Sequence, residues 1–246
     1  MARWPRLVAP GFPMHVTHRG HNRQATFHDA EDFASYREIL HQASRRSACA
    51  IHAYVLMSNH VHLLITPTAP RSAANMMQRV GSRFVRYWNK RHHRSGTLWD
   101  GRFRSSIVDS DLYFMACCRY IDLNPVRAGI SVDAASYIWS SFGRLALGMH
   151  DPLITPHGAY NALGVTDDSR QVAYQTYCAT DGGNRTENTI RLATRGGAAA
   201  GHRQFVAGLE LHLRRPAARK PHGGNRRTAE WHRAAESPIS QFVLGR

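Results

Sequence analysis

The chain has 246 residues, 43% of them hydrophobic, and is therefore long enough to build a sizeable core. No apolar run approaches the roughly 20 residues that cross a bilayer, the first residues lack the apolar stretch of a signal peptide, and the four cysteines form no CxxC pair. These features argue against a membrane protein and a disulfide scaffold, and they predict a cytoplasmic protein with reduced thiols. The formal net charge of +15 predicts a polyanionic partner, most simply nucleic acid.

The positive charge is spread unevenly along the chain. Residues 1–149 hold 19 basic and 9 acidic side chains, residues 150–182 hold 1 and 4, and residues 183–246 hold 12 and 4. A genome rich in Arg codons explains why Arg outnumbers Lys, but it does not explain the excess of bases over acids. We expect a main domain over 1–149, a short helical region over 150–182, and a basic, partly disordered extension over 183–246.

Periodicity and turn signals divide residues 14–123 into alternating strands and helices. In chain order they predict a strand at 14–18, a helix from Asp29 or Asp32 to about 47, strands at 51–57 and 60–65, a helix at 72–91, a strand ending at 108, and a helix from Asp109 or Ser110 to 123. Asn124-Pro125 ends the last helix, because proline disfavours helical geometry at the residue before it. The order β-α-β-β-α-β, followed by a helix, is typical of a ferredoxin-like α/β sandwich, here with a C-terminal extension.

The strand expected at 60–65 contains the tripeptide His60-Val61-His62. Because side chains alternate along a strand, His60 and His62 share one face, with Cα atoms about 6–7 Å apart. At that separation two imidazoles can converge on one divalent metal ion. The alternative is a pair of unrelated strand histidines, one half buried and one solvated.

The helix expected at 72–91 has a row of basic residues on one face, Arg79, Arg83, Arg86 and Lys90. No acidic residue lies between Arg79 and Lys90, so the row repels itself unless an anion is bound. A solvated charged face is the common meaning of such a row. The absence of acids favours the alternative, contact with phosphate groups.

The last helix of the domain carries Tyr120 and Asn124, which are four residues apart and project from one side if the helix continues to its last residue. A phenol oxygen can attack phosphorus and form a covalent phosphotyrosine. A metal held by two imidazoles and an amide oxygen can polarise the phosphate that is cut. The alternative is that Tyr120 packs the helix on the sheet and that Asn124 caps the helix before Pro125.

Five blocks, in order, resemble those of the single-tyrosine HUH transposases, and most closely their REP-associated branch. They are 13–20 (PMHVTHRG), 57–64 (MSNHVHLL), 99–103 (WDGRF), 119–129 (RYIDLNPVRAG) and 139–141 (WSS). An HxH pair alone would be a weak match, whereas five blocks in this order over about residues 5–147 are specific. Residues 150–246 match the family only loosely.

The resemblance implies a metal-dependent DNA transposase that binds single-stranded DNA with an imperfect hairpin, cuts beside the hairpin and rejoins strands. Tyr120 would be the nucleophile that becomes joined to the 5′ phosphate, and His60, His62 and Asn124 would ligate Mg²⁺ or Mn²⁺. Two imidazoles suit Mn²⁺ better than Mg²⁺, which prefers oxygen. Such a protein would work at the bacterial nucleoid, without a membrane partner, as a monomer or a homodimer.

Basic residues from several elements are candidate contacts to the DNA backbone: Arg19, Arg23, Arg79, Arg83, Arg86, Lys90, Arg102, Arg104 and Arg127. If about six of them contact single-stranded phosphates, log affinity should fall against log salt with a slope of about −4.

Two other functions fit parts of this pattern. A DNA-hairpin-binding protein on the same fold would keep the basic surface without cleavage. A phosphoesterase of the two-histidine class is suggested by His15-Val16-Thr17, an HxT, but that class needs a second HxT or HxS and His60-Val61-His62 is neither. Only the transposase requires the Tyr120 hydroxyl, and the phosphoesterase should act without metal.

Overall fold

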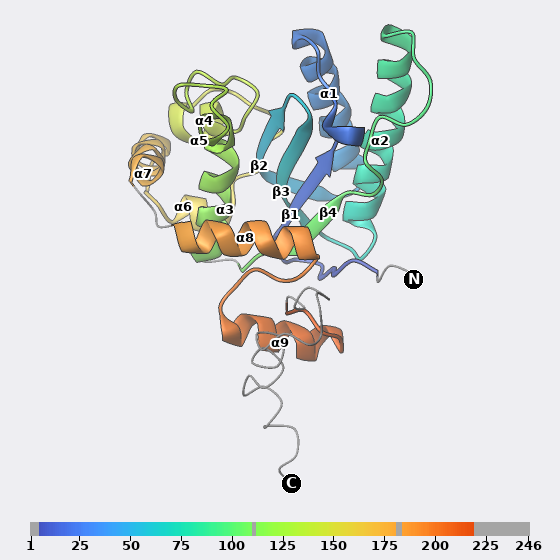
Figure 1. Ribbon diagram of the computed structural model, residues 1–246. Coiled ribbons are helices and arrows are strands. Elements are labelled where there is room, and N and C mark those ends of the chain that lie inside the picture. Colours follow the sequence, from blue (N-terminus) through green and yellow to red (C-terminus); the bar gives the residue numbers. More distant parts are fainter. Residues whose placement is uncertain (1–4, 110–111, 181–183, 219–246) are drawn as a thin grey trace, which may run out of the picture.

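The computed structural model describes residues 5–109, 112–180 and 184–218 (Figure 1). Its central antiparallel sheet is formed by β1 (Met14–Arg19), β2 (Cys49–Met57), β3 (His60–Pro67) and β4 (Arg104–Ile107), in the order β2-β3-β1-β4. Helix α1 (Ala30–Arg46) connects β1 to β2, and α2 (Ser72–Arg91) connects β3 to β4. The predicted order β-α-β-β-α-β and the ferredoxin-like α/β fold class are thereby confirmed.

Local sequence signals set where these elements begin and join. The Asp29 carboxylate caps α1 by accepting hydrogen bonds from the backbone N–H groups of Glu31 (3.1 Å) and Asp32 (3.2 Å). A tight turn at residues 58–59 joins β2 to β3, so that Met57 pairs with His60. This register fixes which residues of β3 face each side of the sheet, because a slip by one residue would exchange the two faces.

Helices α1 and α2 pack on each other and cover one face of the sheet (Figure 1). An aromatic cluster fills the space beneath them. The Tyr36 ring lies 5.0 Å from that of Phe84 and 5.3 Å from that of Phe27, both nearly perpendicular to it. Because helices cover both faces of the sheet, β2 reads as a continuous buried run rather than as an alternating one.

Helix α3 (Leu112–Asp122) packs on the opposite face, against β2 and β3, and is followed by the short helix α4 (Asn124–Arg127). The break at Leu123 is slight: its N–H donates to the Arg119 carbonyl (3.0 Å), and its own carbonyl accepts from the Arg127 N–H (3.0 Å). Pro125 falls in the first turn of α4, where the missing N–H costs no hydrogen bond. The helical hydrogen bonds therefore continue from α3 into α4, and Pro125 causes no change in the direction of the backbone.

The chain continues through α5 (Phe142–Leu147), α6 (Gly158–Asn161), α7 (Asp167–Ala179), α8 (Asn184–Gly196) and α9 (Arg203–Leu213). Helix α8 packs on α3, β4 and β1 and crosses the end of the sheet (Figure 1). After it, Ala200 pairs with the edge of β4: its N–H donates to the Ile107 carbonyl (2.7 Å), and its carbonyl accepts from the Asp109 N–H (2.9 Å). This single bridge joins the segment after α8 to the end of the edge strand β4.

The extension expected to be partly disordered thus contains two helices between residues 184 and 213, and residues 219–246 lie outside the described part of the chain. None of the helices in the described residues combines the length and the apolar character that crossing a membrane requires. All four cysteines are unpaired and buried.

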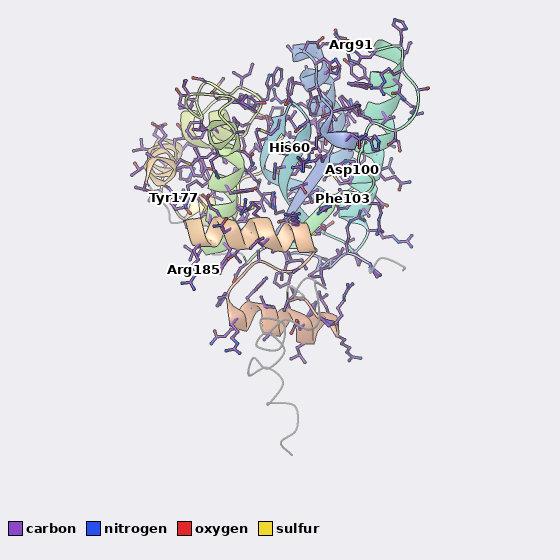
Figure 2. All side chains as sticks on the ribbon, in the orientation of Figure 1. His60, Arg91, Asp100, Phe103, Tyr177 and Arg185 are labelled. Atoms are coloured by element: carbon purple, nitrogen blue, oxygen red, sulfur yellow. The ribbon has the colours of Figure 1, made fainter. Side chains whose placement is uncertain are left out.

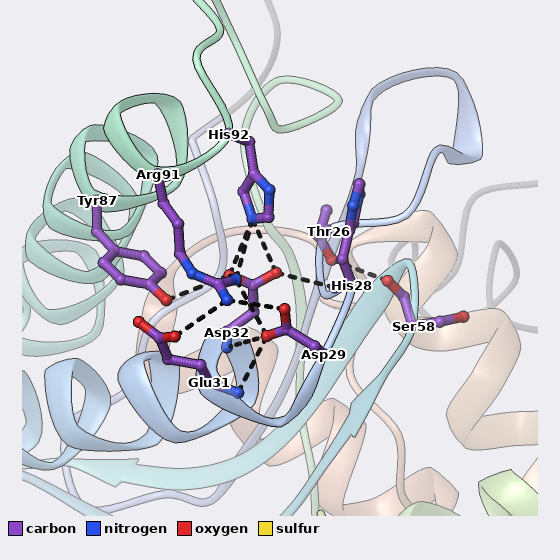
Figure 3. A network of polar contacts seen from close by, with 9 residues as sticks. All are labelled: Thr26, His28, Asp29, Glu31, Asp32, Ser58, Tyr87, Arg91 and His92. Carbon is purple, nitrogen blue, oxygen red and sulfur yellow. Dashed lines mark hydrogen bonds and ion pairs between the residues drawn. The ribbon is translucent and has the colours of Figure 1, made fainter.

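An ionic network joins the start of α1 to the end of α2 (Figure 3). The Arg91 guanidinium contacts Asp29 (2.8 Å), Glu31 (3.0 Å) and Asp32 (2.8 Å). The fully buried Asp32 carboxylate also contacts the His92 ring (3.0 Å). Each acid of this network therefore has a basic partner, and the network holds the two helices together over the sheet.

Candidate active site

Neighbouring strands bring three histidines together on the face of the sheet that α3 covers. Thr17 of β1 pairs with His62 of β3, and His15 lies one alternation away on the same face. The His60 and His62 ring centroids are 5.0 Å apart, and those of His15 and His62 are 5.1 Å apart. His62 and His15 are buried, whereas His60 is half-buried at the sheet end.

Each proposed metal-ligating histidine is held through its Nδ1 atom. His60 Nδ1 lies 2.6 Å from the Asn59 Oδ1 atom, which can only accept, so this nitrogen carries the proton. His62 Nδ1 lies 2.9 Å from His15 Nε2. Protonation at Nδ1 leaves the Nε2 lone pairs free to bind a metal.

Tyr120 and Asn124 reach the same histidines from α3 and α4. The Tyr120 ring stands edge-on to the His62 ring at 5.6 Å and to the His15 ring at 5.7 Å. The Asn124 side-chain nitrogen lies 3.5 Å from His62 Nε2. A flip of the amide would present the Asn124 oxygen at the same place, because the two ends of an amide have nearly the same shape.

Burial controls the protonation of these groups. It lowers the pKa of His60 to about 4 and that of His15 to about 3, and it lowers the pKa of His62 well below its ordinary value. All three rings are therefore neutral near pH 7. Burial raises the pKa of the Tyr120 hydroxyl, while the nearby Arg127 guanidinium, 4.9 Å from the ring centroid, opposes the rise.

A cavity of about 810 Å³ opens over these residues. His60, His62, Tyr120 and Asn124 all line it. Six arginines surround them, four of them predicted DNA contacts and two from α8: Arg19, Arg23, Arg102, Arg104, Arg191 and Arg195. A single carboxylate, Asp100, lies among the lining residues. The cavity therefore combines a candidate nucleophile, candidate imidazole ligands and a row of lining arginines.

The other predicted DNA contacts lie elsewhere. Arg127 is outside the cavity lining, but it stacks on Tyr120 and pairs with Glu187 of α8 (3.1 Å). The row Arg79, Arg83, Arg86 and Lys90 is exposed on α2, across the sheet from Tyr120. Figure 2 shows the end of α2, marked by Arg91, well separated from His60. The structure thus divides the predicted contacts between two faces.

Sequence reasoning missed several residues of the cavity. His15 was visible only as part of an HxT, although alternation along its strand could have placed it beside the other histidines. Thr194, Arg191 and Arg195 lie in the extension expected to be partly disordered, so the sequence did not connect them with the site. They join the cavity because α8 packs on β1 and β4.

The residues present fit a divalent metal ion. Among the described residues, no cluster of three His, Cys, Asp or Glu side chains is arranged to hold one. The ligands predicted from the sequence are two neutral imidazoles, of His60 and His62, and the amide oxygen of Asn124. Such a set suits Mn²⁺ and, less well, Mg²⁺.

Comparisons with known proteins bear on the fold and on the family that this chain resembles. Residues 10–124 match the family model of IS200-like transposases, which spans all four strands and ends at Asn124. A solved REP-associated tyrosine transposase, bound to a REP hairpin, superposes with a TM-score of 0.53 at 18% identity, covering 65% of this chain and 96% of its own.

A second solved structure is a protein from Deinococcus radiodurans R1 whose assignment as a transposase is itself provisional. It matches at 18% identity over 53% of this chain and 98% of its own, with a TM-score of 0.35 that is too low to support an argument. No curated protein matches the sequence. Residues 10–124 of this chain are thus similar to the IS200-like transposases, and its fold is that of the REP-associated tyrosine transposase.

Proposed function

We propose that this protein is a metal-dependent DNA strand transferase that cuts single-stranded DNA beside a hairpin and rejoins it through a covalent 5′-phosphotyrosine. The observation that carries the proposal is the convergence of Tyr120, His60, His62 and Asn124 on one cationic cavity. The hairpin as substrate is supported by the REP hairpin bound to the solved relative of the same fold.

The chemical step conserves the energy of the bond that is cut. The Tyr120 oxygen bonds to phosphorus as the bond from phosphorus to the 3′ oxygen breaks. The phenol loses its proton, and the departing 3′ oxygen gains one and becomes a free hydroxyl. A 3′ hydroxyl can later attack the phosphotyrosine, which releases the Tyr120 oxygen and rejoins the strand.

The residues around Tyr120 favour this step. The Arg127 and Arg191 cations and a hydrogen bond from the Asn124 side chain each lower the pKa of Tyr120, against the larger opposite effect of burial. These cations lie where negative charge develops on the phenol and on the phosphate. A bound Mg²⁺ or Mn²⁺, held by His60, His62 and Asn124, would polarise the phosphate oxygens.

The arginines that line the cavity define a path for single-stranded DNA. Arg102, Arg104 and Arg195 also line a second cavity of about 590 Å³, so the two cavities are adjacent and share these lining residues. Arg6 and Arg215 line that second cavity. A single strand that enters the active-site cavity can therefore leave it along a surface rich in guanidinium groups, which bind phosphate strongly.

A denaturing-gel assay tests the reaction class. Wild-type protein and Tyr120→Phe are each incubated with hairpin-containing single strands from the DNA that flanks the gene, with Mn²⁺ or with EDTA. We expect a protein–DNA band that survives denaturation, requires metal and is missing from the Phe variant. Cleavage that persists in the Phe variant would show that another group is the nucleophile.

The alternative is a protein that binds DNA hairpins without cutting them. It needs the arginines of the cavity but not the Tyr120 hydroxyl. Tight binding of the same hairpins by both proteins, without a covalent band from either, would favour this alternative.

A further inference from the structure

A chain of hydrogen bonds runs from α8 to the candidate metal ligand His62. The Thr194 hydroxyl lies 2.7 Å from His15 Nδ1, and His15 Nε2 lies 2.9 Å from His62 Nδ1. All three side chains are at least 94% buried, with exposures of 3%, 1% and 6%. We infer that Thr194 and His15 are positioning residues, which hold the His62 ring with its Nε2 lone pair directed into the active-site cavity.

The other hydrogen bonds of Thr194 decide which group donates and which accepts at each step from Thr194 to His62. The Thr194 hydroxyl donates to the Ile190 carbonyl one turn earlier in α8 (2.9 Å), so its oxygen is left to accept. It then accepts from His15 Nδ1 and from the Ser106 hydroxyl (2.7 Å). With its proton on Nδ1, a neutral His15 has a lone pair on Nε2, and this lone pair accepts from His62 Nδ1.

The opposite direction would disable the site. If Thr194 donated to His15, the bond to the Ile190 carbonyl would be lost and both imidazole protons would move. His62 would then carry its proton on Nε2, the nitrogen that lies 3.5 Å from the Asn124 amide. A protonated Nε2 cannot bind a metal. Whether His62 can act as a ligand therefore depends on which groups donate in these hydrogen bonds.

Helix α8 is fixed firmly enough to serve this role. Its Glu187 carboxylate contacts Arg119 of α3 (3.2 Å), which precedes Tyr120 in the sequence, and Arg127 of α4 (3.1 Å), whose guanidinium lies over the Tyr120 ring. At its other end, Ala200 pairs with the edge strand β4. The helix is thus anchored both to the helix that carries the nucleophile and to the sheet that carries the histidines.

Thr194, unlike His15, lies outside the residues that match the family model, which end at 124. The inference rests on the proposed function, because it gives α8 a task in the metal site of that function. It predicts that the active site of this protein is completed by a helix of its C-terminal part, through a hydroxyl group that touches neither metal nor DNA.

Two substitutions at one position test the inference in the full-length protein. Thr194→Val keeps the shape of the side chain and removes the hydroxyl, whereas Thr194→Ser keeps the hydroxyl. Mn²⁺ binding is measured by calorimetry without DNA, and the imidazole tautomers are read from ¹⁵N NMR of the histidine rings. Thermal unfolding reports whether each variant is folded.

We expect Thr194→Val to bind Mn²⁺ about tenfold more weakly, as outer partners of metal-binding histidines commonly do when they are removed, and to populate the other His62 tautomer. Thr194→Ser should retain the wild-type affinity and tautomer. Ser106→Ala is the matched control, because it removes a bond to the same Thr194 oxygen without removing the acceptor of His15.

The outcomes separate this inference from the proposed function. A folded Thr194→Val with wild-type Mn²⁺ affinity and wild-type tautomers would overturn the inference and leave the phosphotyrosine reaction standing. Wild-type protein that binds Mn²⁺ in the expected way but forms no covalent DNA band would overturn the function and leave the inference standing. Wild-type protein that binds no Mn²⁺ would overturn both.

Discussion

The two faces of the sheet differ in how their charged side chains are paired. On the face covered by α1 and α2, the Arg91 guanidinium is surrounded by three carboxylates, and the buried Asp32 is fully paired (Figure 3). On the face covered by α3 and α8, six arginines line a cavity that contains a single carboxylate, and its buried histidines are neutral.

This difference indicates which face contributes to stability and which contributes to function. A network in which every charge has a partner stabilises the fold but has no unpaired charge to bind a ligand. A cavity whose cations outnumber its acids repels itself until an anion enters it, and neutral imidazoles keep lone pairs for a metal. We therefore expect substitutions on the first face to change the free energy of unfolding, and substitutions on the second face to change binding and cleavage.

The largest effect is expected at Asp32. Asp32→Ala leaves Arg91 and His92 without their buried partner, so we expect a loss of about 3–5 kcal/mol in the free energy of unfolding, measured by urea denaturation. Glu31→Ala, the matched control, removes an exposed contact to the same Arg91 and should cost about 1 kcal/mol or less. Covalent adduct formation per folded molecule should be unchanged in both. Equal costs for the two would contradict the special role of the buried carboxylate.

Removal of either candidate histidine ligand should reduce adduct formation strongly and the free energy of unfolding only weakly. His60→Ala and His62→Ala should each lower the yield of the covalent adduct by about 100-fold or more, because even outer partners of metal ligands contribute 10- to 100-fold. The free energy of unfolding should fall less than in Asp32→Ala. An adduct yield that stays at the wild-type level in His60→Ala would remove that residue from the site.

The pH dependence of metal binding follows from burial of the histidines. Protons compete with a metal for the lone pair on Nε2. An exposed histidine is protonated below about pH 6.5, so its affinity for a metal begins to fall there. Because burial lowers the pKa of His60 to about 4 and that of His62 well below 6.5, Mn²⁺ affinity should stay constant as the pH falls from 8 to about 5. Calorimetric titrations across this range check the expectation, and a decline that begins near pH 6.5 would contradict it.

The smallest effect, and the sharpest test of which face binds DNA, comes from single arginines. Removal of one phosphate contact to a single strand should flatten the plot of log affinity against log salt by about 0.7. We expect this change for Arg195→Ala in the cavity. Arg83→Ala on α2 is the comparison: a similar change there would extend the DNA path to the other face, as the basic row of the sequence predicts.

Local patterns in the sequence sufficed for most of the fold. Strand alternation placed His60 and His62 on one face, helical spacing gave 72–91 for α2 without error, and Asn124-Pro125 marked the end of α3. These features depend on neighbours within a few residues, so they leave a periodic trace. The sequence also indicated the resemblance to transposases, since the family model covers residues 10–124, which hold three of the five motif blocks and part of a fourth.

Only the tertiary structure decided what completes the site. His15 and Thr194 are 179 positions apart and meet because α8 packs across β1 and β4. A hydrogen bond between such distant side chains produces no repeat or spacing in the sequence, and the segment around Thr194 is short and bounded by glycines. The same topology, rather than composition, decided which arginines face Tyr120 and which lie across the sheet from it. The sequence therefore determined the elements and the helix of Tyr120, while folding determined which residues share the cavity.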